Sequence, residues 1–240
     1  MRQQLGLGVN GGGELLLQEL HSKIARVLEE QFPATIDTEP ELLAHHYTAA
    51  GLTDAAIPLW LKAGQRALGA MALSSAIAHL ESGLRLIEGL PASPQRDDWE
   101  LQIRTTTSVA WEALRGWMAP QITEVLLPAL NLAKRSSQPA VLARTLWGLW
   151  VNPLTEGRIA ESLRWANELL SAAETSTDEG LTLIAHMVAM VTHFWLGNLT
   201  TAKMHGDTIL TVYDPARHGN IARAMNHDPK TLTGLYASSR

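Results

Sequence analysis

The chain of 240 residues contains no cysteine. Disulfides, thiolate metal ligands and thiol catalysis are therefore excluded, and the composition fits a reducing compartment, for which we expect the cytoplasm. Phenylalanine is also scarce, with 2 residues against 8 tryptophans. Indole rings must therefore supply most of the large aromatic groups of the core.

Positive charge is not in excess, because 19 lysines and arginines stand against 24 aspartates and glutamates. A nucleic-acid surface needs a clustered excess of basic residues, so we expect no nucleic-acid partner. Long apolar runs are also lacking. The run at residues 181–196 is interrupted by His186, Thr192 and His193 and is too short to span a bilayer. We expect no membrane partner, and we recognise no signal peptide in the glycine-rich N-terminus.

Apolar residues recur with helical spacing through most of the chain. Two stripes carry the same offsets of four, seven and eleven residues, at Ala56, Trp60, Ala63 and Ala67 and again at Ala76, Leu80, Gly83 and Ile87. Small residues in such a stripe let neighbouring helices approach closely, and the larger residues fill the groove. This pattern is typical of packed helical hairpins.

Glycine turns repeat along the chain in the same relation to the helices. Gly51, Gly157 and Gly197 are each followed five residues later by a small residue, and the last two turns are 40 residues apart. That distance is close to the period of two-helix solenoid repeats. We therefore predict an all-α fold, an α-α superhelix similar to tetratricopeptide (TPR) repeats, with about five antiparallel helical hairpins.

The N-terminal residues are rich in glycine, and several later positions have the sequence signals of helix starts. Residues 1–13 are too rich in glycine for regular structure, so we expect a disordered tail followed by a single helical-repeat domain at residues 14–240. Thr38 and Ser176 each stand three residues before a glutamate, which is the spacing of a capping box. Thr53 and Ser93 are further N-cap candidates, and Ser93 precedes a proline suited to the first helical position.

The C-terminal end has the character of a truncated repeat. A solenoid that ends there would leave Leu232, Leu235 and Tyr236 without a covering hairpin. We therefore expect self-association through this end of the chain.

Sequence motifs of catalytic or nucleotide-binding sites are weak or absent throughout the chain. Gly6, Gly8 and Gly11 form a GxGxxG sequence, but a strand cannot precede it and no βαβ unit follows. Neither a GxSxG nucleophile elbow nor a GxxxxGK[ST] phosphate loop occurs. We expect no catalytic residue and no cofactor, and hence no enzyme.

Nine histidines raise the question of a metal site. His186 and His193 share one helix face but lack a third ligand, and the adjacent His45 and His46 point about 100° apart on a helix. Asp214, His218, His227 and Asp228 cluster around two Asp-Pro turns, which turn chemistry explains without a metal. We therefore expect no metal.

Aromatic residues offer the remaining site candidates. Trp147, Trp150, Trp165 and Trp195 occur at helical spacing, where they are core residues or line a binding groove. The residues that we take as candidate contacts of a groove or partner are Trp147, Trp150, Trp195, His193 and His218.

Several segments together carry a resemblance to a known family. They are PELLAHHYTAAGLTDAAIPLWLKAGQRA at residues 40–67, LWGLWV at 146–151, FWLGNL at 194–199, YDPARH at 213–218 and HDP at 227–229. In this order they resemble the TPR-like C-terminal region of large bacterial signalling proteins that combine a nucleotide cyclase domain with an AAA-type ATPase module. The resemblance covers about residues 14–235.

The resemblance implies a regulatory part and not a catalytic one. The cyclase aspartates and Walker motifs of that family lie upstream of this region, and nothing in this sequence matches either. It implies a non-catalytic module that binds a partner protein or its sister signalling domains. An alternative is a small-molecule sensor, similar to the inducer-binding solenoid of maltose-type transcription activators. A closed pocket favours sensing, whereas an open groove favours a protein partner.

Overall fold

The structure is a computed structural model that describes residues 9–136, 138–224 and 229–236. Within these ranges it contains thirteen helices and no strand, which confirms the predicted all-α fold. Helices pack mainly on the helices adjacent to them in the chain, as in an α-α superhelix built from helical hairpins. The contacts divide the chain into two compact units, residues 1–114 and 115–240.

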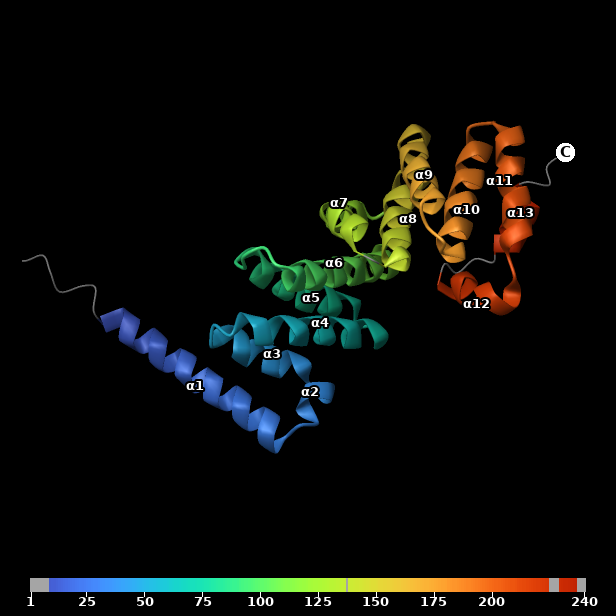
Figure 1. Cartoon of the computed structure of the whole chain (residues 1–240). Coiled ribbons are helices and arrows are strands. Elements are labelled where there is room, and N and C mark those ends of the chain that lie inside the picture. Colours follow the sequence, from blue (N-terminus) through green and yellow to red (C-terminus); the bar gives the residue numbers. More distant parts are fainter. Residues whose placement is uncertain (1–8, 137, 225–228, 237–240) are drawn as a thin grey trace, which may run out of the picture. The chain divides into compact units, whose positions relative to one another are not determined.

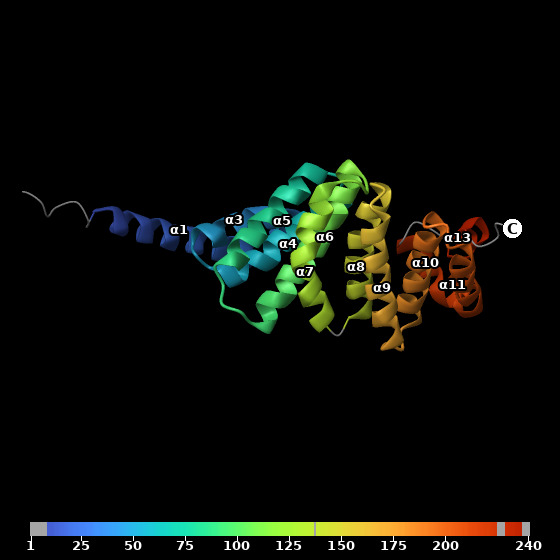
Figure 2. The same ribbon diagram turned by 90° about the horizontal axis from the view of Figure 1, so that it is seen from above.

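The first unit consists of helices stacked in the order of the chain (Figures 1 and 2). They are α1 (Val9–Gln31), α2 (Thr35–Thr38), α3 (Pro40–Ala49), α4 (Thr53–Gly69), α5 (Leu73–Glu88) and α6 (Pro94–Arg115), of which the last residue is counted with the second unit. One buried cluster joins α1, α3 and α4 and includes Ala25, Leu43 and Ala56. Another joins α4, α5 and α6 and includes Ile57, Leu80 and Ile103.

The second unit has the same character. Its helices are α7 (Pro120–Arg135), α8 (Pro139–Thr155), α9 (Ile159–Glu174), α10 (Glu179–Trp195), α11 (Leu199–Val212), α12 (Pro215–Ala224) and α13 (Pro229–Tyr236). Fully buried side chains form its core, among them Leu126, Leu146, Leu149, Leu169, Leu183, Met190 and Ile209. At the C-terminal end of the described residues, Tyr236 packs edge-on against Phe194 and Leu235 is exposed.

Glycine turns link helices in both units with one geometry. Gly51, Gly157 and Gly197 have φ between 72 and 77°, the left-handed region in which a side chain is strained. The N–H of the following residue donates to a carbonyl five residues earlier, at 2.8–2.9 Å, as Leu52 does to Tyr47. This is the Schellman motif, which satisfies the last carbonyls of a helix. The small residues five positions after these glycines, Ala56, Ser162 and Ala202, are completely buried.

A fourth turn of the same kind occurs between α4 and α5 without a glycine. Met71 occupies the left-handed position with φ 59°, and Ala72 donates to the carbonyl of Ala67 at 2.9 Å. Five residues after Met71 stands Ala76, which is completely buried. The two stripes predicted from the sequence therefore belong to helices that each follow a Schellman turn. The sequence did not reveal the second turn because methionine stands where glycine is usual.

Several predicted helix starts can be compared with the structure. Ser93 Oγ accepts the N–H of Arg96 at 3.1 Å, which confirms this N-cap. Ser176 is not the cap of α10, because Asp178 Oδ1 accepts the N–H of Leu181 at 2.7 Å. Thr38 is not a cap either, since its hydroxyl donates to the carbonyl of Ala34 within α2.

Two further boundaries differ from the sequence interpretation. Thr53 is the first residue of α4 and not its cap, because the turn at Gly51 places Leu52 at the N-cap position. Helix α1 begins at Val9, so residues 9–13 are helical despite their glycines, whereas residues 1–8 lie outside the described residues. Among the helices that the structure describes, none has both the length and the apolar character needed to cross a membrane.

Replacement of Met71 by glycine should stabilise the protein. Glycine removes the strain of a left-handed methionine, and the Met71 side chain is 69% exposed, so little burial is lost. We expect Met71→Gly to raise the free energy of unfolding of the first unit by about 1 kcal/mol. Denaturant unfolding followed by circular dichroism measures it. The matched control is Gly51→Ala, which has open space around the new methyl group and should lower stability by about as much. A Met71→Gly protein no more stable than the parent would contradict the assignment.

Candidate functional site

A cavity of about 580 Å³ lies between α8, the start of α10 and α12 in the second unit. Its volume is in the range of small-molecule sites. The apolar part of the wall comes from Ala140 and Ala143 of α8, Leu181 and Ile184 of α10, and Ile221 of α12. Charged side chains of both signs line the rest, among them Arg144, Asp178, Glu179 and Arg217.

His218 ties α12 to α10 beside this cavity. Its Nδ1 atom accepts the backbone N–H of Asp214 at 3.0 Å, and its Nε2 atom lies 3.0 Å from Glu179 Oε2. The imidazole is buried, and the backbone donor requires that a neutral ring carries its proton on Nε2. Arg217 Nη1 is 2.8 Å from the same Glu179 oxygen. Since both His218 nitrogens are engaged, the ring has no lone pair available to act as a general base in this arrangement.

The turn before α12 also uses Asp214. Its carboxylate accepts the backbone N–H of Ala216 at 2.9 Å and the Nε–H of Arg217 at 3.2 Å. The bond from Ala216 and the neighbouring Arg217 guanidinium hold the pKa of Asp214 below its ordinary value. Of the predicted cluster of aspartates and histidines, Asp214 and His218 therefore meet, whereas His227 and Asp228 lie outside the described residues.

The lining of the cavity combines apolar and charged groups. Its apolar wall suits a hydrocarbon or ring system, and the arginines and carboxylates at its edge suit polar or charged groups. Arg144 stacks over the ring of Trp147 with its Cζ atom 4.9 Å from the centroid, which fixes the direction of its guanidinium. Ligands with an apolar body and a charged end fit this chemistry.

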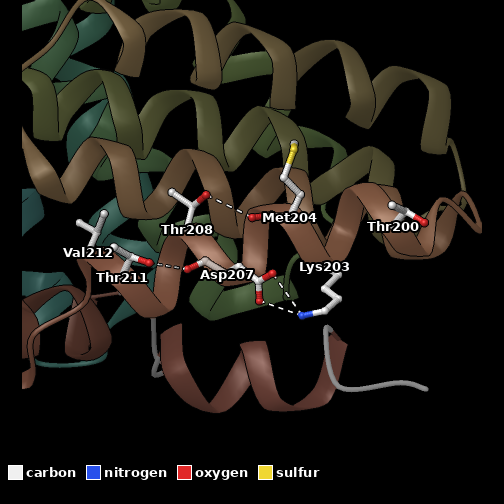
Figure 3. Close-up of a pocket in the computed structure, with 7 residues that line it drawn as sticks. All are labelled: Thr200, Lys203, Met204, Asp207, Thr208, Thr211 and Val212. Carbon is white, nitrogen blue, oxygen red and sulfur yellow. Dashed lines mark hydrogen bonds and ion pairs between the residues drawn. The ribbon is translucent and has the colours of Figure 1, made fainter.

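A second hollow, of about 590 Å³, follows the surface of α11 and is open (Figure 3). The lining residues that the structure describes all lie on α11. Figure 3 shows Lys203 turned toward Asp207. Its Nζ atom donates to Asp207 Oδ1 at 3.0 Å. Met204 is 56% exposed. An apolar side chain beside an ion pair, on an open helix face, is the chemistry of a protein contact more than of a small-molecule pocket.

The tryptophans among the candidate contacts do not gather around one groove. Trp147 and Trp150 are 2% and 5% exposed and lie in the core of the second unit. The indole N–H of Trp150 donates to Thr192 Oγ1 at 2.8 Å, which satisfies it inside that core. Trp195 is 59% exposed and contacts Phe194 edge-on.

Histidines form two clusters that join neighbouring helices. On α10 and α11, His186 Nδ1 lies 3.0 Å from His205 Nδ1, and the ring of His193 stacks on that of His205 at 5.7 Å. On α1 and α3, His21 Nδ1 lies 2.8 Å from His46 Nδ1, with His45 beside both rings. In each nitrogen pair one ring must donate and the other accept, so the two rings cannot both be charged without loss of the bond.

In each cluster, the sequence singled out only the histidines that lie on one of the two helices. His186 and His193, like His45 and His46, are close in sequence on one helix, whereas His205 and His21 come from the neighbouring helices and were missed. No spacing rule connects residues of different helices, so only the pairing of α10 with α11 and of α1 with α3 could reveal them. In the part of the chain that the structure describes, no group of three such side chains is placed to hold a metal ion.

Burial lowers the pKa of all three histidines of the second-unit cluster. The pKa of His205 is lowered to about 4, mainly by burial and to a smaller extent by electrostatic repulsion from His186 and His193. Burial also lowers the pKa of His186 and of His193 from their ordinary value of 6.5. The unfolded chain therefore takes up protons near pH 6.5, while folded His205 stays neutral until the pH is much lower.

Comparisons of the chain with protein-family models, with curated proteins and with solved structures gave no match.

Acid should weaken the second unit through these histidines. Because the unfolded state binds more protons between about pH 6.5 and pH 4, the stability due to the depressed pKa values is lost as the pH falls through this interval. After allowance for solvent screening, we expect His205 to contribute a loss on the order of 1 kcal/mol at pH 5. Denaturant unfolding at pH 7.5 and pH 5 measures it.

The variant His205→Gln should reduce this pH dependence, because it removes the imidazole with the lowest pKa and keeps a polar side chain. His79→Gln on α5 is the matched control, since it removes one histidine outside this cluster. Equal pH dependence in the His205→Gln variant and the parent would show that the cluster does not govern acid stability.

Proposed function

We propose that the chain is a non-catalytic helical-repeat module that binds a protein partner and serves a nucleotide-cyclase and ATPase type of signalling protein. The segments at residues 40–67, 146–151 and 194–199 support this family, and stacked helical hairpins of this kind commonly present binding surfaces. The partner that fits best is a sister domain of such a signalling protein.

The observation that carries the proposal is the open face of α11. Met204 stands exposed next to the Lys203–Asp207 ion pair, in a hollow whose described lining residues belong to α11. Such a face is complementary to an amphipathic helix with one apolar side chain between charges of both signs. We assign this face to the partner domain.

The test is a titration of the full chain into the purified cyclase and ATPase domains of a protein of this family. We expect saturable binding with a Kd in the micromolar range, about tenfold weaker for Met204→Lys because the apolar contact is lost. Leu52→Lys is the control, since Leu52 is a partly exposed leucine on the first unit. Absence of binding to both domains would overturn the proposal, and equal loss in both variants would overturn the assignment to α11.

A second candidate function is small-molecule sensing, which the cavity between α8, α10 and α12 favours. A thermal-shift screen against nucleotides and sugars tests it. Sensing predicts that one ligand class raises Tm and that Ala140→Phe abolishes the shift, because the larger ring fills the cavity from an exposed position on its edge. No shift with any class, or a shift that Ala140→Phe leaves unchanged, would exclude sensing in this cavity by these compounds.

A further inference from the structure

Helix α1 exposes several large apolar side chains near its N-terminus. Its α-helix runs over 23 residues, whereas α3, on which it packs, has 10. Figures 1 and 2 show the N-terminal part of α1 extending beyond α3. On this part four leucines are 52–70% exposed: Leu15, Leu16, Leu17 and Leu20. Contiguous apolar surface of this kind marks an interaction site.

The face that packs on α3 is a different one. His21 contacts His46, Ala25 is completely buried, and the hydroxyl of Tyr47 donates to Glu29. This bond and burial raise the pKa of Tyr47 to about 12. The exposed stripe lies one residue earlier in each turn, and is thus rotated by about 100° from the α3 contact. It contains Leu16, Leu20 and Val27, which are exposed, and Ile24, which is half-buried.

We propose that this stripe, the α1 stripe, pairs with the same stripe of a second copy of the chain in antiparallel orientation. The stripe is self-complementary in that orientation. When Leu20 of one copy lies opposite Ile24 of the other, Leu16 comes opposite Val27, and all four layers are apolar.

The charged residues beside the α1 stripe support a second, antiparallel copy of the chain as its partner. Glu19, Lys23, Arg26 and Glu30 all follow one side of it. In an antiparallel two-fold pair the same flanks of both helices meet, so Glu19 of one copy falls between Lys23 and Arg26 of the other. A parallel pair would instead turn this charged flank toward the side of the partner helix that α3 occupies. Glu19 and Lys23 already pair within one helix at 2.7 Å, and association would extend this pair into a network.

Association would also explain how the first turns of α1 are maintained. Residues 12–20 are exposed on every side of the helix, and they begin with glycines. Helical segments of this length without tertiary packing are marginal in water, and glycine weakens them further. A second copy would supply the packing that the first unit does not provide for this segment.

Sedimentation velocity on the full chain over a range of concentrations tests the proposal. We expect a dimer with a Kd in the micromolar range or tighter, and a monomer for the double variant Leu16→Glu/Leu20→Glu. Both side chains are exposed, so the variant should still fold, which a cooperative unfolding transition followed by circular dichroism verifies. Leu235→Glu tests the C-terminal end, through which the sequence led us to expect self-association, and should leave a dimer formed by α1 intact.

Charge reversal tests the orientation. Glu19→Lys should weaken the dimer roughly tenfold, because the new positive charge of each copy then lies between Lys23 and Arg26 of the other. Addition of Lys23→Glu and Arg26→Glu to that variant should restore it. A monomer at every concentration overturns the proposal, as does a dimer that Leu235→Glu abolishes and the α1 variants do not. Failure of the triple variant to recover overturns the antiparallel pairing.

Discussion

The close approach of one helix to the next after a fixed turn is the constraint on which both units depend. At each Schellman turn a residue in the left-handed region reverses the chain, and five residues later a small side chain is buried against the neighbouring helix. Contacts between the helices are also close further along the chain. A methyl group on Gly64 of α4, for example, would lie 2.4 Å from Leu80 of α5. The turn sets the start of the second helix, and the small residues set how near it comes.

The all-α class and much of the hairpin pattern could be predicted, because the period of small and large apolar residues is a local property of the sequence. The turn at Met71 could not, since left-handed backbone is seldom occupied by methionine and the flanking residues alone do not require it. Helix capping was predicted only in part. Ser93 caps α6 as the sequence predicts. Helix α10 is capped by Asp178, whereas the capping-box spacing favoured Ser176. The division after Leu114 depends on contacts that no local pattern contains.

The candidate sites, too, could be predicted only as far as local sequence patterns determine them. His218 was singled out in the sequence for its cluster with aspartates, yet its partner Glu179 is 39 residues away and comes from another helix. The tryptophans were correctly placed at helical spacing, but their role depends on which face is covered. Trp150 is bonded to Thr192 within the core, whereas Trp195 remains at the surface. Side chains that meet across helices are decided by packing, and the cavity between α8, α10 and α12 is a product of that packing.

The three-residue Schellman turns also determine where the chain can change length during evolution. One residue inserted between Gly157 and Ile159 would rotate α9 by about 100° and carry Ser162 away from the carbonyl of Trp150, to which it donates at 3.3 Å. The connections before α6 and α10 have more residues and no left-handed glycine, so an extra residue there can be absorbed without rotating a helix. Insertions and deletions in relatives of this chain should therefore concentrate at residues 89–93 and 175–178, while the tight turns keep a constant length.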